Sequence, residues 1–307
     1  MRFAKGHGTE NDFVILPDPD GLVGLSATFA ARLCDRRAGL GADGVLRVVR
    51  TAALAAGPAG RPARRATGTP DPAEWFMDYR NADGSVAEMC GNGLRVFARY
   101  LLEHGMAEGP AFAVATRAGL RRVRVEPGGS ITADMGPVSV LGPGRAVSGG
   151  IVLDGLRISV GNPHLACLMD TPLDKFDLSA PPELDPGQFP AGANIELVEL
   201  TGPGALTMRV HERGSGETRS CGTGAVAAAA AAAAAAGPAP GAVATAPGAG
   251  APTGRAAGVG DGTYWQVHVP GGELTVTLDG STSWLTGPAV IVAEGDLDPG
   301  WLAAARS

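Results

Sequence analysis

Two cysteines open the same four-residue pattern, Cys-Gly-x-Gly, at Cys90–Gly93 and at Cys221–Gly224. Each pattern precedes a helix-forming segment, and the second runs into ten consecutive alanines, Ala227–Ala236, the best helix formers. A thiol at a helix N-terminus lies where free N–H groups and the helix dipole favour negative charge. The glycines leave those N–H groups open to a carboxylate. The sequence therefore predicts two proton-transferring thiols, each at an anion-binding helix end.

A thiol pair is suited to inverting a carbon centre, because inversion needs a base on one face and an acid on the other. We expect Cys90 and Cys221 to face each other across one active site, one as thiolate and the other as thiol. Two other interpretations stay open from the residues alone. The pair could form a redox couple, or each cysteine could be a buried apolar residue, as we expect for Cys34 and Cys167.

Polar residues at strand and helix ends are further candidates. His164, in the turn Gly161–His164, is a candidate partner for thiolate formation. Glu212 and Arg213 precede the second glycine pattern, where Glu212 could move protons or bind an ammonium and Arg213 could clamp a carboxylate. Amides donate and accept, which suits an amino-acid substrate, and those in or beside predicted loops are Asn11, Asn81, Asn92, Asn162 and Asn194. Taken alone, each of these residues is more often an ordinary turn residue or a member of a solvated pair.

Composition excludes several classes of protein. The 307 residues are 45% hydrophobic and carry a formal net charge of −6, which argues against nucleic-acid or anionic-membrane partners. Four cysteines are too few for a disulfide framework. The first residues contain no apolar stretch of the kind found in signal peptides, so none is expected. The histidines are scattered, and no P-loop, Rossmann or pyridoxal-phosphate motif stands out. We expect a cytoplasmic protein with free thiols, no metal and no cofactor; a homodimer is left open.

The predicted elements alternate many strands with few helices. Helices are expected from Ser26 to about Arg37, after Cys90 and after Cys221. In the second, the apolar residues at helical spacing are Leu94, Phe97, Ala98, Leu101 and Leu102. The predicted strands are 3–16 (interrupted by a polar loop), 45–49, 75–79, 111–116, 120–126, 131–135, 151–160, 165–169, 194–200, 206–210, 265–269, 273–278 and 284–293. Residues 51–73 and 237–262 are rich in alanine, proline and glycine and are predicted to be loops. This order predicts an α+β fold of two similar lobes with a cleft between them.

The sequence resembles the diaminopimelate epimerase family over nearly its whole length. The resemblance rests on ordered motifs at 5–13, 81–85, Cys90–Gly93, Gly161–His164, Ala193–Ile195, Glu212–Thr218, Cys221–Gly224 and Thr286–Ala289. It implies two pseudo-symmetric lobes, each a curved, mostly antiparallel sheet around a central helix, with the active site in the cleft between them. The last strand would return to the first lobe, giving lobes of 1–134 with 289–307, and 135–288.

The resemblance also implies an isomerase that interconverts LL- and meso-2,6-diaminopimelate without a cofactor, in lysine and peptidoglycan precursor synthesis. A proline-type two-thiol racemase and a thiol redox protein are the alternatives. The implied acid/base residues are Cys90 and Cys221, supported by His164 and Glu212. The implied substrate-binding residues are Asn11, Asn81, Gly91, Asn92, Asn162, Asn194, Glu212, Arg213, Gly222 and Thr223.

Two positions depart from the family pattern. The first motif usually reads Leu-Gly where this chain has Thr9 and Glu10. The glycine-rich loop usually ends in glutamine where this chain has Gly44. We expect one side-chain contact near Gly44 to be missing, and neither change to affect the chemistry.

Overall fold

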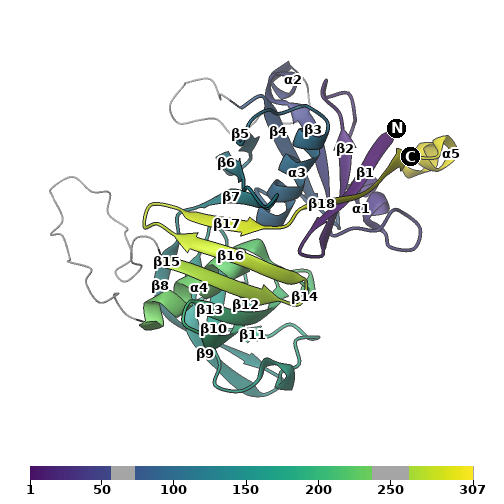
Figure 1. Ribbon diagram of the computed structural model, residues 1–307. Coiled ribbons are helices and arrows are strands. Elements are labelled where there is room, and N and C mark those ends of the chain that lie inside the picture. Colours follow the sequence, from purple (N-terminus) through teal and green to yellow (C-terminus); the bar gives the residue numbers. More distant parts are fainter. Residues whose placement is uncertain (57–72, 237–262, 307) are drawn as a thin grey trace. The chain divides into compact units, whose positions relative to one another are not determined.

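The computed structural model describes residues 1–56, 73–236 and 263–306. The chain divides into two compact units (Figure 1), Met1–Ala133 with Gly287–Ser307, and Asp134–Thr286. Strands dominate both units and helices are few, so the fold is α+β, as predicted.

The first unit combines the N-terminal residues with the C-terminal end of the chain. Its strands are β1 (Arg2–Gly8), β2 (Asn11–Pro17), β3 (Gly44–Arg50), β4 (Trp75–Asn81), β5 (Ala111–Thr116), β6 (Gly119–Val125), β7 (Ile131–Gly136), along which the chain leaves the unit, and β18 (Val290–Asp296). Its helices are α1 (Ala27–Cys34), α2 (Thr51–Ala56), α3 (Gly91–Glu103) and α5 (Pro299–Arg306).

The second unit is continuous in sequence. Its strands are β8 (Ser139–Ser148), β9 (Ile151–Ser159), β10 (Pro163–Leu168), β11 (Glu183–Leu184), β12 (Asn194–Gly202), β13 (Ala205–Glu212), β14 (Gly216–Thr218), β15 (Thr263–Val269), β16 (Gly272–Leu278) and β17 (Ser283–Gly287). Its helices are α4 (Gly222–Ala236) and the 3-10 helix Leu173–Lys175.

The two units pair their main strands in the same way. In the first, the order β18-β1-β2-β3-β4-β5-β6-β7 is antiparallel except for the parallel pairs β2–β3 and β4–β5. In the second, the order β8-β9-β10-β12-β13-β15-β16-β17 is antiparallel except for the parallel pairs β10–β12 and β13–β15. In each unit a cysteine-led helix interrupts the chain at the second parallel connection. The two units therefore share one strand order, interrupted by a helix at the same place.

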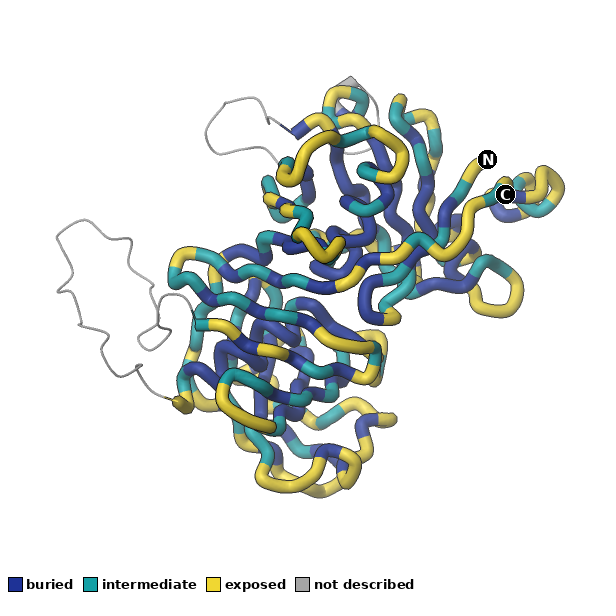
Figure 2. Tube along the Cα trace, viewed as in Figure 1, coloured by how far each residue is buried: buried dark blue, intermediate teal, exposed yellow. Residues whose placement is uncertain are grey.

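A central helix lies against the sheet of each unit. Helix α3 contacts β1, β2, β3, β4 and β18, and α4 contacts β9, β10, β12, β13, β15 and β16. In α3, the predicted apolar positions Leu94, Phe97 and Leu101 are fully buried. In α4, residues 225–232 are fully buried as well (Figure 2). A helix that is apolar on every side must be covered on most sides, and the sheet of its own unit covers the alanine run as far as Ala233; Ala235 and Ala236 at its end are exposed.

Several predicted boundaries are wrong. The predicted loop 51–73 begins with α2, while residues 57–72, like the predicted loop 237–262, lie outside the described residues. The helix after Ser26 was expected to reach Arg37 but ends at Cys34, where Asp35 leaves the helical conformation. Strand β8 was not predicted, because Gly142, Pro143 and Gly144 interrupt its strand pattern; the ladder with β9 supplies the pairing that local propensity does not.

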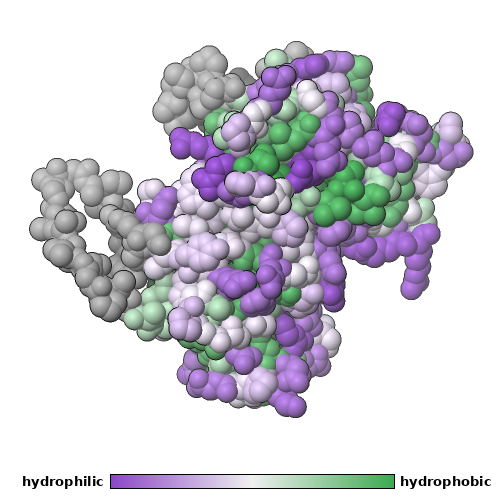
Figure 3. Space-filling model, in the orientation of Figure 1, coloured by the Kyte–Doolittle hydropathy of each residue, from purple (hydrophilic) through white to green (hydrophobic). Residues whose placement is uncertain are grey.

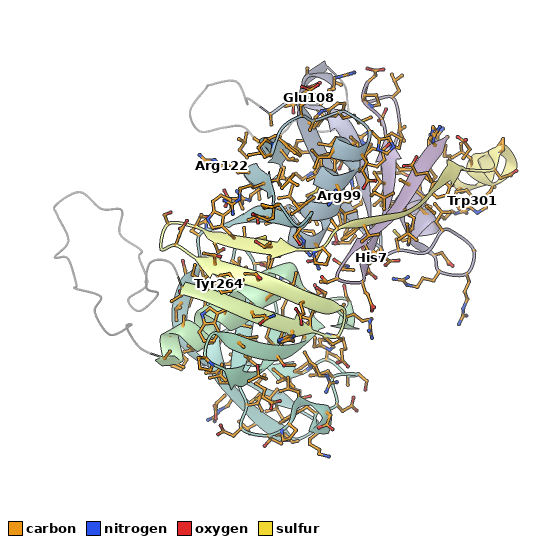
Figure 4. All side chains as sticks on the ribbon, viewed as in Figure 1. His7, Arg99, Glu108, Arg122, Tyr264 and Trp301 are labelled. Atoms are coloured by element: carbon orange, nitrogen blue, oxygen red, sulfur yellow. The ribbon has the colours of Figure 1, made fainter. Side chains whose placement is uncertain are left out.

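The C-terminal helix α5 was also missed, because its eight residues give little periodic signal. Tertiary contacts hold it on α1. Trp301, labelled in Figure 4, donates from Nε1 to the Ala38 carbonyl at 2.9 Å. Arg32 of α1 donates to the carbonyl of Ala304 at 2.7 Å. Helix α5 therefore ties the chain end to the first unit.

The polar loop predicted between the first two strands is a tight turn. Gly8 pairs with Asn11 across it, and Thr9 and Glu10 have φ values of 51° and 60°. Two successive left-handed residues are characteristic of a type I′ hairpin turn, in which glycine is preferred at the second position. The departure from the family motif thus places Glu10 where a side chain is strained.

We predict that Glu10→Gly stabilises the protein. A non-glycine residue in the left-handed region costs about 1–2 kcal/mol. Glycine removes this strain, but it also makes the unfolded chain more flexible, which offsets part of the gain in stability. The expected gain is about 0.5–1 kcal/mol in the free energy of unfolding, measured by urea denaturation. Gly105→Ala, at a left-handed helix end with φ 60°, should shift stability the opposite way. A loss of stability in Glu10→Gly would contradict the strain argument.

The visible surface is mostly hydrophilic or intermediate in hydropathy, with separate hydrophobic patches (Figure 3). Large apolar side chains that are exposed include Leu22, Tyr264, Val290 and Val292. Single exposed apolar residues are common on folded proteins and need no special explanation. Within the described residues, no helix is both long enough and apolar enough to cross a membrane.

Candidate active site

In the first unit, Cys90 is the N-cap of α3. Its backbone is extended, with φ −137° and ψ 123°, and its carbonyl accepts the first helical hydrogen bond from the N–H of Leu94 at 2.8 Å. The sulfur accepts a hydrogen bond from the Gly93 N–H at 3.4 Å. The predicted placement of this thiol at a helix N-terminus is therefore correct.

Asn11 connects Cys90 to the rest of its cluster. Its Nδ2 donates to Asp43 at 2.7 Å, which turns Oδ1 toward α3. That oxygen accepts from Nδ2 of Asn92 at 3.2 Å and lies 3.7 Å from the Cys90 sulfur. Asp43, which the sequence analysis did not select, thus fixes the amide orientation at the site. Asn81 is oriented differently, because its Nδ2 donates to Ser85 at 2.9 Å.

Arg95 is a further residue that the sequence analysis missed. It lies fully buried in α3, with Nη2 3.5 Å from the Thr9 hydroxyl and Nε 3.5 Å from the carbonyl of Pro288. Burial lowers the pKa of Arg95 to about 10, and the nearby Cys90 opposes that shift. The same attraction favours negative charge on the Cys90 sulfur. The sequence signal that could have identified Arg95 is its position as a charged residue among the apolar residues of the predicted helix.

The structure explains the departure at Gly44. A Cβ at this position would lie 2.5 Å from the Arg80 carbonyl oxygen and 2.6 Å from the ring of Tyr79. The ring therefore occupies space that any side chain at this position would need. Tyr79 in turn packs edge-on against Phe13, with ring centroids 6.0 Å apart.

In the second unit, Cys221 directly precedes α4 and accepts backbone hydrogen bonds in the same way as Cys90. Its sulfur accepts from the Gly224 N–H at 3.4 Å, and its carbonyl accepts from the Ala225 N–H at 2.9 Å. The Thr223 hydroxyl lies 3.5 Å from the sulfur. The two Cys-Gly-x-Gly patterns therefore form the same local structure, as predicted.

The predicted bias toward thiolate is wrong for Cys221 in this structure. Burial, followed by the carboxylates of Glu212 and Glu196, raises the pKa of Cys221 well above its ordinary value; the hydrogen bonds from Thr223 and Gly224 oppose the rise without cancelling it. Desolvation penalises a charge more than one helix end stabilises it. Cys221 is thus a protonated thiol at neutral pH.

His164 is completely buried on β10 beside Cys221's helix. Its Nδ1 lies 2.6 Å from Oε1 of Glu196, also completely buried, and its Nε2 lies 3.0 Å from Oδ1 of Asn162. Nδ2 of Asn162 donates to the Thr223 hydroxyl at 3.3 Å. Glu196 escaped the sequence analysis because it alternates with apolar residues in a predicted strand and belongs to no recognised motif.

Asn194, Glu212 and Arg213 lie at neighbouring strand ends. Asn194 stands opposite His164 in the parallel pair β10–β12, and its Oδ1 accepts from the Arg213 N–H at 2.9 Å. The Arg213 guanidinium donates to the carbonyl of Ala191 at 2.8 Å. Glu212 accepts a hydrogen bond from the Thr218 hydroxyl.

Most predicted site residues thus gather around one cysteine in each unit. The first cluster contains Asn11, Cys90, Gly91 and Asn92. The second contains Asn162, His164, Cys221, Gly222 and Thr223, with Asn194, Glu212 and Arg213 at the adjoining strand ends. By contrast, Cys34 and Cys167 are buried as predicted, and burial raises the pKa of each to about 12. In the described part of the chain, no group of three or more metal-ligating side chains is positioned to hold an ion.

Two matched α+β units, each with a cysteine at the N-terminus of its central helix, define the class of fold. Solved structures with this fold include a hydroxyproline epimerase from Agrobacterium vitis, with a TM-score of 0.58 and 15% identity over 100% of this chain and 98% of that chain. A phenazine biosynthesis protein of the PhzF family from Bacillus anthracis has a TM-score of 0.59 and 16% identity over 97% and 98%. Such distant likeness establishes the fold alone.

Sequence comparison identifies the family. The family model described as diaminopimelate epimerase matches residues 3–141 and 156–292. The diaminopimelate epimerase of Thermobifida fusca is 59% identical over 97% of this chain and 98% of its own length. The diaminopimelate epimerase of Rhodococcus opacus is 50% identical over 98% of this chain and 98% of its own length. The chain belongs to the diaminopimelate epimerase family, which confirms the resemblance predicted from its motifs.

Proposed function

We propose that this protein interconverts LL- and meso-2,6-diaminopimelate by two-thiol proton transfer at Cα, in the cytoplasm and without a cofactor. The observation that carries the proposal is the pair of equivalent cysteines, Cys90 and Cys221, at the two central helix ends of a chain in this family. In the proposal the lobes are 1–134 with 289–307, and 135–288, and the two sulfurs flank one substrate carbon in the cleft between them.

One thiolate removes the Cα proton, and the opposite thiol donates a proton to the other face. Cys221 is buried and protonated, which suits it to act first as the acid in one direction. Arg95 beside Cys90 favours negative charge on the partner sulfur. The two roles exchange when the reaction runs in reverse.

The reacting carboxylate would rest on the helix ends, at Gly91 and Asn92 and at Gly222 and Thr223. Free N–H groups there stabilise the negative charge that develops when the Cα proton leaves. His164 and Glu212 would support proton transfer. The remaining proposed contacts, mostly to the distant, non-reacting end of the substrate, are Asn11, Asn81, Asn162, Asn194, Glu212 and Arg213.

The direct test is incubation of LL-2,6-diaminopimelate with the purified protein in deuterium oxide without pyridoxal phosphate. We expect meso-diaminopimelate to form with deuterium at the inverted Cα, followed by NMR and chiral chromatography. L-Proline under the same conditions tests the proline-type alternative, and prior oxidation of the thiols tests the redox alternative. Turnover of proline but not of diaminopimelate, or activity that requires oxidised thiols, would overturn the proposal.

A further inference from the structure

A continuous hydrogen-bonded chain leads from the buried Glu196 to the sulfur of Cys221. Its links are Glu196 to His164 at 2.6 Å, His164 to Asn162 at 3.0 Å, Asn162 to Thr223 at 3.3 Å and Thr223 to Cys221 at 3.5 Å. All five residues lie in the second unit, on β10, β12 and the start of α4 or next to them.

Donor and acceptor rules give this chain a direction. An amide oxygen only accepts and an amide nitrogen only donates, so with Oδ1 of Asn162 on His164, the ring must carry its proton on Nε2. Nδ2 of Asn162 donates to the oxygen of Thr223. The Thr223 oxygen, which accepts from Asn162, can then donate its own hydrogen to the sulfur of Cys221 at 3.5 Å.

The direction depends on Glu196. With Nε2 of His164 protonated, the proton between Nδ1 and Oε1 is shared by the ring and the carboxyl group, as an imidazolium with a carboxylate or as a neutral pair. Burial raises the pKa of Glu196, although His164 opposes the rise, so this site retains a proton readily. Without the carboxyl group of Glu196, the neutral ring of His164 can carry its proton on Nδ1, which makes Nε2 an acceptor. The amide of Asn162 and the hydroxyl of Thr223 can then reverse the direction of their hydrogen bonds.

We propose that Glu196 is a positioning residue that, through His164, Asn162 and Thr223, directs a hydrogen bond at the sulfur of Cys221 and so stabilises its thiolate. This role deepens the proposed function, because it concerns one of the two proposed acid/base groups. Among the described residues, the titratable groups that act on Cys221 are the carboxyl groups of Glu212 on β13 and Glu196 on β12, and His164 on β10 is hydrogen-bonded to Glu196.

Two opposite effects make the idea testable. As a bare negative charge, Glu196 raises the pKa of Cys221, so its removal would lower that pKa. As the anchor of the chain, Glu196 keeps a donor on the sulfur, so its removal would raise the pKa of Cys221. A hydrogen bond to a charged group corresponds to a shift of about 1–2 pH units.

The experiment measures the pH dependence of Cys221 alkylation by iodoacetamide in the full-length protein, with peptide mass spectrometry to separate the four cysteines. We expect Glu196→Leu to move the midpoint upward by about one pH unit or more, and Thr223→Val to move it similarly. The double variant should show no further shift, because both changes break the same chain. Glu199→Leu, on the same strand but only partly buried, should leave the midpoint unchanged.

A second measurement uses the pH profile of kcat for epimerisation. In this profile, Glu196→Leu should raise the pH midpoint of the limb that reports the ionisation of Cys221. It should also lower kcat, with KM changed less than kcat. Glu196→Gln, which can donate an amide hydrogen to Nδ1 of His164, should restore much of the loss; this conservative variant also serves if the leucine variant does not fold.

An unchanged or lowered midpoint in Glu196→Leu, or additive shifts in the double variant, would overturn the proposal. The alkylation arm needs no turnover. A protein that does not epimerise diaminopimelate yet shows the predicted shifts would refute the proposed function and leave the role of Glu196 standing.

Discussion

Replacing either Cys90 or Cys221 by alanine should abolish stereochemical inversion, while leaving each variant able to exchange the Cα proton of one stereoisomer with solvent. Inversion needs both groups, and loss of a positioned acid or base costs about 10²–10⁴-fold in rate. The remaining thiol still reaches one face of the carbon. We expect the two variants to exchange deuterium into opposite stereoisomers, measured by NMR on purified LL- and meso-diaminopimelate.

The matched controls are Cys34→Ala and Cys167→Ala, which remove buried thiols outside both clusters. These variants should keep inversion, apart from any loss of stability. If Cys90→Ala and Cys221→Ala both exchanged the same stereoisomer, the sulfurs would act from one side, and the two-base mechanism would fail. Normal turnover by either variant would also contradict the two-base mechanism.

Asp78→Asn should cause the largest loss of stability among changes outside the cysteine clusters. Asp78 and Arg47 pair at 2.9 Å with side chains only 2–3% exposed, and Asp78 also binds Arg117. Removing one partner of a buried pair costs about 3–5 kcal/mol, because the other charge stays buried without compensation. Asp18, 3.3 Å from Arg47, offsets part of this, so we expect about 3 kcal/mol by urea denaturation.

The pH dependence of this loss has a defined sign. Burial alone would raise the pKa of Asp78, but Arg117, Arg47 and Arg80 together lower it below its ordinary value. A depressed carboxyl pKa contributes stability above the unfolded-state pKa of about 3.9, and that contribution is lost as pH falls. The gap between wild type and Asp78→Asn should therefore narrow below about pH 4.

Asp154→Asn is the exposed control, because Asp154 pairs with Arg145 at 2.7 Å with both side chains more than 60% exposed. Solvent-exposed pairs contribute about 0–1 kcal/mol. Equal losses in Asp78→Asn and Asp154→Asn would show that burial does not set the strength of the inner pair. The inner pair joins β3 to β4. Strand β3 begins directly after Asp43, and β4 ends at Asn81.

The sequence by itself determined the local structure around each thiol. A cysteine followed by glycines and a helix-forming run places its sulfur at a helix N-terminus whatever the rest of the chain does, because the free N–H groups are a property of the helix end. The apolar spacing of Leu94, Phe97 and Leu101 likewise fixed the buried face of α3. The ordered motifs were specific enough to indicate the family.

Only the tertiary structure decided the electrostatics. Burial of Cys221 beside Glu196 and Glu212 outweighs the helix end and keeps the thiol protonated, and burial depends on strands distant in sequence. Glu196, Arg95 and Asp43 act through contacts with residues far along the chain, so no local pattern marks them. Hydrogen bonds and desolvation depend on distances in space, whereas helix caps and apolar periodicity depend on neighbours in sequence.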